Sequence, residues 1–565
     1  MFLTFKKRLI FVLSFLLLYF SIYMLLFHSI YTSNNIIISF AIHPFNICSK
    51  YPYAWSNIKK LSLLFMVVSN LIISNSIFSF YFKKYSKYSK KSNTLPTFYN
   101  DGFHLKIGNA INNTAIYLPL GGLFQNILVT GTIGTGKTSS AMYPFTEQLI
   151  SYANSNFSEK FSMLILDVKG NYYKQVEKYC KTYNRLQDLI VIDLKNKVKY
   201  NPLDKPNLKA SILANRLKTI LTLFSPNNSE SFWLDKAEQI LCEAIKFCRL
   251  YNNNYVTFSE LHNLITVPDY FSKKLEIVKE NFFSGNLSKE DAYHLLSCIN
   301  FFEKEFKALD SRTLSILKSE ITRITNSFIS DIDVLNTFSP PKKDITFDGF
   351  SDVLKNGKIV VLNMNISEYR NLSKIIAAYL KLDFQTEVML NLASGYIPRI
   401  SVFISDEYHE YVTATDADFF AQSREAKCIN IVATQSYTSL LNTINNKYTV
   451  NAITQNLINK LWYRTDDILT IEEAQKQIGK TEKTKFSRSI SENGKETTFN
   501  YLTKKFQSFD SNISESINTY TQFDFIYDTN FFTQTLQCFH CLCFLSTGSN
   551  IISPQELKMI PYFKK

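Results

Sequence analysis

The stretch GTIGTGKTS, from Gly131 to Ser139, constrains this chain more than any other. It matches the pattern G-x-x-x-x-G-K-[ST] at Gly131, Gly136, Lys137 and Thr138. The apolar run NILVT precedes it and predicts a strand, while a helix is expected to begin near Lys137. Backbone N–H groups and the positive end of that helix would then converge on an anion. The stretch therefore predicts a phosphate-binding loop.

Such a loop binds a nucleoside triphosphate, ATP or GTP, together with a divalent cation, expected to be Mg²⁺. Lys137 is expected to contact the β- and γ-phosphates, and Thr138 to be a ligand of Mg²⁺. The residues expected to bind the nucleotide are Gly131, Thr132, Ile133, Gly134, Thr135, Gly136, Lys137, Thr138 and Ser139.

Around this loop, short β-type runs alternate with helical stretches, which is typical of an α/β fold with a parallel sheet. Residues 205–345 instead show apolar positions at helical spacing, which predicts an all-α insertion that splits the nucleotide-binding domain in two. A stretch near 480–519, rich in Ser, Thr, Lys and Asn, predicts a mobile surface excursion or a long loop. Four parts are therefore expected. They are an N-terminal part (1–100), the first part of the nucleotide-binding domain (101–204), the all-α insertion (205–345) and the second part of the nucleotide-binding domain (346–565).

Residues 1–100 carry 11 Lys or Arg and no Asp or Glu, although the whole chain has a net charge of +14. The remaining 51 basic and 48 acidic residues leave only +3 beyond residue 100. Two charge-free apolar runs, 9–27 and 61–82, approach the ~20 residues of a membrane-spanning helix. They predict a two-helix transmembrane hairpin. The competing interpretation of the first run is a cleaved signal peptide. Flanking lysines favour both termini in the cytoplasm.

Three apolar runs end in an aspartate, at Asp167, Asp193 and Asp406. The acid that binds Mg²⁺ in a P-loop ATPase ends a buried strand, and a second carboxylate that activates water usually follows it. Only Asp406 is followed directly by an acid, Glu407. We therefore predict Asp406 as the acid on the magnesium side and Glu407 as the catalytic carboxylate. Asp167 and Asp193 are interpreted as strand ends, with Lys169 as a partner of Asp167.

Two further residues are catalytic candidates. Gln435 follows the apolar run INIVAT, where a polar side chain can reach the γ-phosphate or the attacking water. Arg424 lies between the two strands that precede Asp406 and Gln435, and an arginine there can stabilise transition-state charge or simply be solvated.

The segment LQCFHCLCFLS brings together Cys538, His540, Cys541 and Cys543, which raises the possibility of a zinc site. Contiguous residues of a strand point alternately to opposite faces, so four ligands could not converge from it. Its apolar composition instead predicts a core strand.

Taken in order, several motifs make the chain resemble the type IV secretion system coupling proteins, the membrane-anchored ATPases of conjugative DNA transfer. These are the apolar hairpin, the P-loop followed by Pro144, LDVKGN, YNPLD, SFWLDKA, SDEYHE with Arg424, and ATQS. LDVKGN is similar to a D-P-K-G-E segment of that family, with Val168 and Asn171 as departures.

The resemblance implies a RecA-like nucleotide-binding domain with the all-α insertion, six subunits around a channel, and Arg424 as an arginine finger in the neighbour's site. It implies a protein of the bacterial inner membrane that moves DNA, as a relaxase-bound single strand, into a secretion channel. The alternatives are a chromosome-type DNA translocase, an ATPase that delivers effector proteins, and a nucleotide-binding docking platform with negligible turnover.

Overall fold

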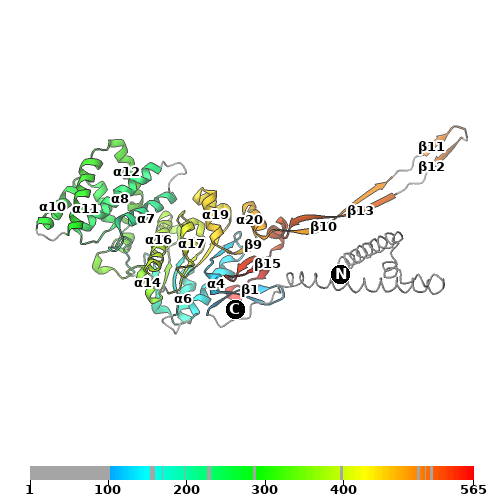
Figure 1. Ribbon diagram of the computed structural model, residues 1–565, viewed down its shortest axis with the longest axis horizontal. Coiled ribbons are helices and arrows are strands. Elements are labelled where there is room, and N and C mark those ends of the chain that lie inside the picture. The colour runs from blue at the N-terminus through cyan, green and yellow to red at the C-terminus, as the bar shows by residue number, and fades with distance from the viewer. Residues whose placement is uncertain are drawn as a thin grey trace, which may run out of the picture. The chain divides into compact units, whose positions relative to one another are not determined.

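An eleven-stranded sheet forms the centre of the computed structural model (Figure 1). The structure describes residues 102–564 except 153–158, 168, 196–197, 225–230, 284–287, 395–398, 493–496, 503 and 509–512. In spatial order the strands are β2 (Ala115–Pro119), β1 (His104–Ala110), β15 (Ile551–Lys558), β14 (His540–Ser546), β9 (Asn459–Tyr463), β3 (Ile127–Thr130), β8 (Cys428–Thr434), β7 (Ser401–Ser405), β4 (Ser162–Leu166), β6 (Ile359–Leu362) and β5 (Leu189–Ile192). Strands β9 to β5 in this order are parallel, and the others pair antiparallel. The predicted α/β fold with a parallel sheet is therefore confirmed.

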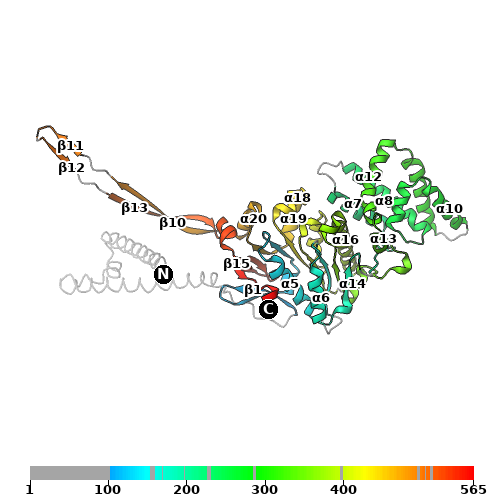
Figure 2. The same ribbon diagram turned by 180° about the vertical axis from the view of Figure 1, so that it is seen from behind.

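Helices cover both faces of this sheet (Figures 1 and 2). Successive strand residues point to opposite faces, and in β3 Leu128 belongs to one buried apolar cluster while Ile127 and Val129 belong to the other. The helices of the nucleotide-binding part are α4 (Leu120–Leu123), α5 (Tyr143–Ser151), α6 (Tyr172–Thr182), α14 (Phe350–Asn356), α15 (Ile366–Tyr369), α16 (Asn371–Ala393), α17 (Asp416–Gln422), α18 (Tyr437–Ile444), α19 (Lys447–Asn456) and α20 (Ile468–Ile478). Burial on both faces explains the unbroken apolar runs of the central strands.

Every element that the structure describes between Ala210 and Phe338 is helical, as predicted. These elements are α7 (Ala210–Phe224), α8 (Ser231–Tyr251), α9 (Phe258–Thr266), α10 (Tyr270–Phe283), α11 (Lys289–Ile299), a π-helical turn (Asn300–Phe306), α12 (Ser311–Ile329) and α13 (Ile332–Phe338). Asp383 on α16 accepts a hydrogen bond from Arg216 on α7 at 2.8 Å and pairs with Lys205 at 3.0 Å. All three side chains are buried, so this cluster fixes α7 to α16.

The polar stretch near 480–519 is paired β-structure, so its description as a loop-like excursion was wrong in part. Strand β10 (Lys480–Glu492) pairs antiparallel with β13 (Ile513–Phe525), and β11 (Thr497–Asn500) pairs with β12 (Lys505–Ser508) (Figure 2). Directly opposite residues share a face, and one face of β10 and β13 carries the exposed apolar side chains Phe486, Ile490, Ile517 and Phe523. Polar and apolar residues alternate along both strands, and this period of two is compatible with a two-stranded ladder that has no buried core.

The predicted transmembrane runs, 9–27 and 61–82, lie outside the described residues. Among the helices of the described part, none combines the length and the apolar character needed to cross a bilayer. The segment 540–546 forms β14, which confirms the predicted core strand, and Cys541 and Cys543 are buried in it.

Candidate nucleotide site

The candidate site lies where four neighbouring parallel strands end. Thr130 of β3 pairs with Thr434 of β8, and Ser405 of β7 pairs with Leu166 of β4, so each of these pairs ends level. The ends of β7 and β8 differ by two residues, because Ser405 pairs with Val432. The phosphate-binding loop, Gln435, the Asp406–Glu407 pair and Asp167 therefore follow at one edge of the sheet. The carboxyl end of a parallel sheet is the usual place for a ligand in such folds.

The loop from Gly131 to Ser139 is held by its neighbours. The N–H of Gly131 donates to the Gln435 carbonyl at 3.2 Å, and the N–H of Thr132 donates to the Arg464 carbonyl at 2.9 Å. Gly136 has φ +95°, and a Cβ there would overlap the ring of Phe539. Glycine is thus required at this position both by backbone conformation and by close packing.

Lys137 lies at the start of the helix, as predicted. It is buried, and its ammonium donates hydrogen bonds to the carbonyls of Gly131 and Thr132, the latter at 3.1 Å. Burial lowers the pKa of Lys137, and the carboxylates of Glu407 and Asp406 oppose that shift. The lysine thus contacts the loop directly, and its charge interacts with the two acids.

Asp406 comes directly after β7 and faces the loop. Its Oδ2 accepts a hydrogen bond from Thr138 Oγ1 at 2.8 Å. Burial raises the pKa of Asp406 to about 6, and Lys169 opposes this effect. A hydroxyl and a carboxylate oxygen side by side suit Mg²⁺, which prefers oxygen ligands, and a cation there would favour the ionised acid. These two residues fit the predicted metal ligands.

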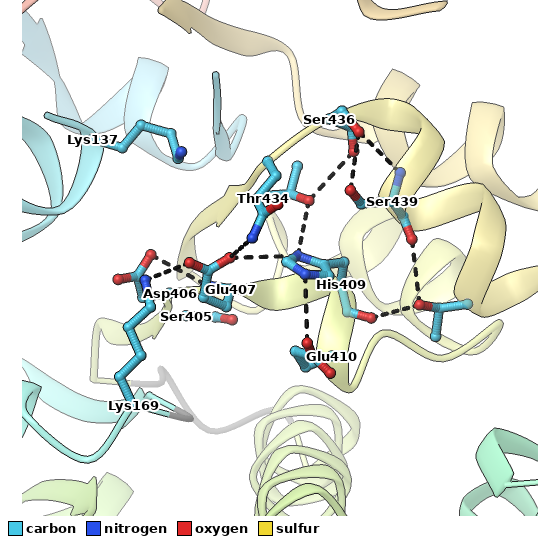
Figure 3. Close-up of polar contacts among 12 residues, drawn as sticks. Lys137, Lys169, Ser405, Asp406, Glu407, His409, Glu410, Thr434, Ser436 and Ser439 are labelled. Carbon is cyan, nitrogen blue, oxygen red and sulfur yellow. Dashed lines mark hydrogen bonds and ion pairs between the residues drawn. The ribbon is translucent and has the colours of Figure 1, made fainter. Parts of the chain in front are cut away.

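Glu407 lies between three polar side chains (Figure 3). Its carboxylate pairs with the Lys169 ammonium, accepts a hydrogen bond from Gln435 Nε2 at 3.2 Å, and lies 3.7 Å from His409 Nδ1. Burial alone would raise the pKa of Glu407, but the contact with Lys169 and the Gln435 bond outweigh it, so the pKa is lowered. Its backbone is left-handed, with φ +50° and ψ +44°. This conformation is uncommon for Glu and is typical of functional sites.

Asp167 and Asp193 have structural partners, in keeping with their interpretation as strand ends. Asp167 accepts hydrogen bonds from the N–H groups of Asn171 and Tyr172 at 3.1 Å, where α6 begins. Lys169 was expected to pair with Asp167, but only its N–H does so, at 2.9 Å, while its ammonium contacts Glu407. The chain turns after β4, which carries the long side chain across to the neighbouring strand end.

Arg424 lies away from the loop of its own chain. It is an exposed residue between α17 and β8, whereas Gln435 follows the other end of β8. The seven residues of β8 span roughly 23 Å at about 3.3 Å per residue. Arg424 and the nucleotide loop of one chain are thus at opposite edges of the sheet.

Three residues after Glu407 had no role in the sequence analysis. Tyr408 is fully buried and donates to Asp416 at 2.5 Å, and Asp416 also pairs with Lys381 of α16 at 2.6 Å. His409 bonds Thr434 at 3.3 Å, and Glu410 pairs with Lys374 of α16. Sequence reasoning missed this cluster because its charges are far apart in the chain and look like ordinary helix residues.

The cavity around these residues has a volume of about 460 Å³. Its lining includes Lys137, Thr138, Asp406 and Glu407, and also the aromatic side chains Tyr143, Phe539, Tyr562 and Phe563. Volumes of this size are ordinary for sites that bind small molecules.

Neither the known protein-family profiles nor the curated protein sequences contain a match to this chain. Solved structures do match it. The unbound bacterial conjugative coupling protein TrwB, lacking 70 N-terminal residues, superposes with a TM-score of 0.51 at 12% identity over 80% of this chain and 88% of its own. TrwB with ADP and Mg²⁺ gives a TM-score of 0.50 at 12% identity, over 80% and 89%.

This chain has the fold of the conjugative coupling protein TrwB. VirB4 of Thermoanaerobacter pseudethanolicus also matches, with a TM-score of 0.47 at 12% identity over 83% of this chain and 99% of its own. The structural match to TrwB covers most of the described residues, so the resemblance inferred from the motifs is confirmed at the level of the fold.

Proposed function

We propose that this protein is a P-loop ATPase that anchors in the bacterial inner membrane and couples ATP hydrolysis to DNA movement in conjugation. The observation that carries the proposal is the contact between Thr138 and Asp406, with Glu407 beside it, at the loop edge of a sheet with the TrwB fold. This arrangement is what hydrolysis of a γ-phosphate by in-line attack of water requires.

Each residue has a distinct part in that reaction. Lys137 binds the β- and γ-phosphates, and Thr138 and Asp406 hold Mg²⁺, which offsets phosphate charge when bound. Glu407 accepts the proton of the attacking water, and its contact with Lys169 keeps it ionised. Gln435 donates to Glu407 and orients the same water.

We propose that Arg424 acts on the nucleotide of a neighbouring copy of the chain. Its place at the opposite edge of the sheet prevents it from reaching its own loop, so a second copy of the chain is needed to complete each site. The resemblance to coupling proteins makes a homo-hexamer the proposed assembly. An arginine supplied in this way stabilises the charge of the transition state.

The cargo and partners follow from the resemblance to coupling proteins. The proposed cargo is single-stranded DNA with its relaxase, delivered to the proteins of a type IV secretion channel. The apolar runs 9–27 and 61–82 would anchor the chain in the membrane twice and leave its bulk in the cytoplasm. Delivery of effector proteins, or translocation of chromosomal DNA, is the competing use of the same motor.

The test uses the full chain purified in detergent, with phosphate release measured with and without single-stranded DNA. The expected result is DNA-stimulated hydrolysis that is lost in Lys137→Ala. Equal and negligible rates in both proteins would refute the motor and favour a docking platform. If a secreted protein stimulates phosphate release and single-stranded DNA does not, the result would favour delivery of effector proteins.

Arg424 is tested by mixing inactive variants. Arg424→Ala and Lys137→Ala are each expected to be inactive alone, because each lacks one half of a shared site. When the two are mixed, some interfaces pair an intact loop with an intact Arg424, and partial activity returns. No recovery, in mixtures shown to co-assemble, would place Arg424 outside the neighbour's site.

A further inference from the structure

The cavity that contains the phosphate-binding residues is also bordered by aromatic rings from far along the chain. Phe539 precedes β14, and Tyr562 and Phe563 belong to a short 3₁₀ turn, Tyr562–Lys564. All three line the same cavity as Lys137 and Thr138. None of them is needed to bind phosphate or activate water.

Phe539 is fixed in place against the loop. Its ring packs over Gly136, its N–H donates to the Thr135 carbonyl at 3.1 Å, and its carbonyl accepts from the N–H of Met559 at 2.8 Å. It adopts φ +63°, a left-handed conformation that is a true outlier for a bulky side chain. Such conformations persist where the surroundings enforce them, often at ligand sites. Phe539 thus links the loop to the segment after β15.

That segment is anchored by ring contacts and leaves the ring of Phe563 partly exposed. Tyr562 makes an edge-to-face contact with Tyr143, with 5.1 Å between ring centroids. Phe563 lies 6.0 Å from Phe539, with the ring planes at 74°, and is 57% exposed. A flat apolar group that covers this exposed ring would remove apolar surface from water, which is favourable.

We propose that the base of the bound nucleotide stacks on Phe563, with Phe539 as the adjoining wall. The inference rests on the proposed function, because it assumes that the triphosphate lies at Lys137. A nucleotide bound there must place its base within or beside the same cavity, and the aromatic rings are its apolar border. Stacking does not depend on the hydrogen-bonding edge of the base, so adenine and guanine are both accepted.

The experiment separates the base from the phosphates. Binding of ATP, GTP and inorganic tripolyphosphate to the full chain is measured by calorimetry with Mg²⁺, for wild type, Phe563→Ala and Phe563→Trp. Phe232→Ala is the matched control, since Phe232 is 51% exposed and does not line this cavity. Phe563→Ala is expected to weaken ATP and GTP about tenfold and to leave tripolyphosphate unchanged. Phe563→Trp and Phe232→Ala should bind all three ligands like wild type.

The outcomes distinguish this inference from the proposed function. If wild type binds neither ATP nor tripolyphosphate, the proposed function fails and the base site fails with it. If both bind but Phe563→Ala retains wild-type affinity for ATP, only the base site is refuted. A loss of tripolyphosphate affinity equal to that of ATP would show that the variant disturbs the loop, and would likewise refute stacking.

Discussion

Glu407→Gln is expected to stop hydrolysis without harming nucleotide binding. The amide has the size of the carboxylate but cannot accept a proton from water. Loss of a general base costs a factor of about 10²–10⁴ in kcat, which corresponds to about 2.7–5.5 kcal/mol of activation free energy. The affinity for ATP should stay equal or rise, because one negative charge beside the phosphates is removed.

The folding cost of this change is small. Lys169, the ionic partner of Glu407, has a side chain that is 53% exposed, so water can solvate its ammonium when the partner is lost. Glu407 itself is buried, but glutamine is neutral, so the substitution leaves no buried charge without a partner and the cost should stay at about 1 kcal/mol or less. The thermal midpoint of Glu407→Gln should therefore stay close to that of wild type, and a loss of activity cannot be ascribed to unfolding.

A matched control lies three residues further on. Glu410→Gln removes the same charge from the same turn, but Glu410 pairs with Lys374 and does not line the cavity. Phosphate release at saturating ATP and calorimetric ATP binding are measured for both variants of the full chain. Glu410→Gln should retain wild-type kcat. If Glu407→Gln hydrolyses ATP within about threefold of wild type, Glu407 is not the base.

Three further changes test other parts of the structure. Lys169→Met removes the cation that lowers the pKa of Glu407, so burial raises that pKa and the acid limb of the kcat/KM profile should move to higher pH. Lys169→Arg should restore the wild-type profile, and an acid limb that does not move in Lys169→Met would contradict the reasoning. Lys381→Met leaves the buried carboxylate of Asp416 without its cation and should lower the free energy of unfolding by about 3–5 kcal/mol. Lys374→Met on the same helix should lower it by about 1 kcal/mol or less. Chemical denaturation measures both, and equal losses would contradict this expectation. Replacing residues 483–522 by a short Gly-Ser loop should leave ATP affinity unchanged in a calorimetric titration, because none of the residues that the structure describes in this range lines the cavity. A large loss of affinity would show that the segment supports the site.

The phosphate-binding loop and the Asp406–Glu407 pair could be found from the sequence because each is a contiguous signal. A buried strand followed by glycines, or by two acids, is visible within ten residues. Their proximity in the fold could not be derived in the same way, because β3 and β7 are separated in the sheet by β8, which comes later in the chain. The order of strands depends on pairing between distant segments, and local patterns do not encode it.

Other features were hidden for different reasons. Strands β10 and β13 are rich in Ser and Thr, so composition suggested a loop, although their side chains alternate in a way that suits a two-stranded ladder. Phe539 and Phe563 lie 400 or more residues after the loop they accompany, and a lone aromatic residue carries no local sign of a ligand. Lys169 was assigned to the nearer acid because proximity in sequence was the only available guide.

The two acids of the site are held in different ways, and this separates their roles. Asp406 is buried, its Oδ2 faces Thr138, and the turn after it is fixed by Tyr408 and the buried Asp416. Glu407 instead depends on Lys169, which reaches it from another loop and is half exposed. A rigid acid suits a cation that must stay in place, whereas a carboxylate with an adjustable partner can exchange an ion pair for a water molecule. Changes at Lys169 should therefore alter kcat and its pH dependence before they alter binding of the nucleotide.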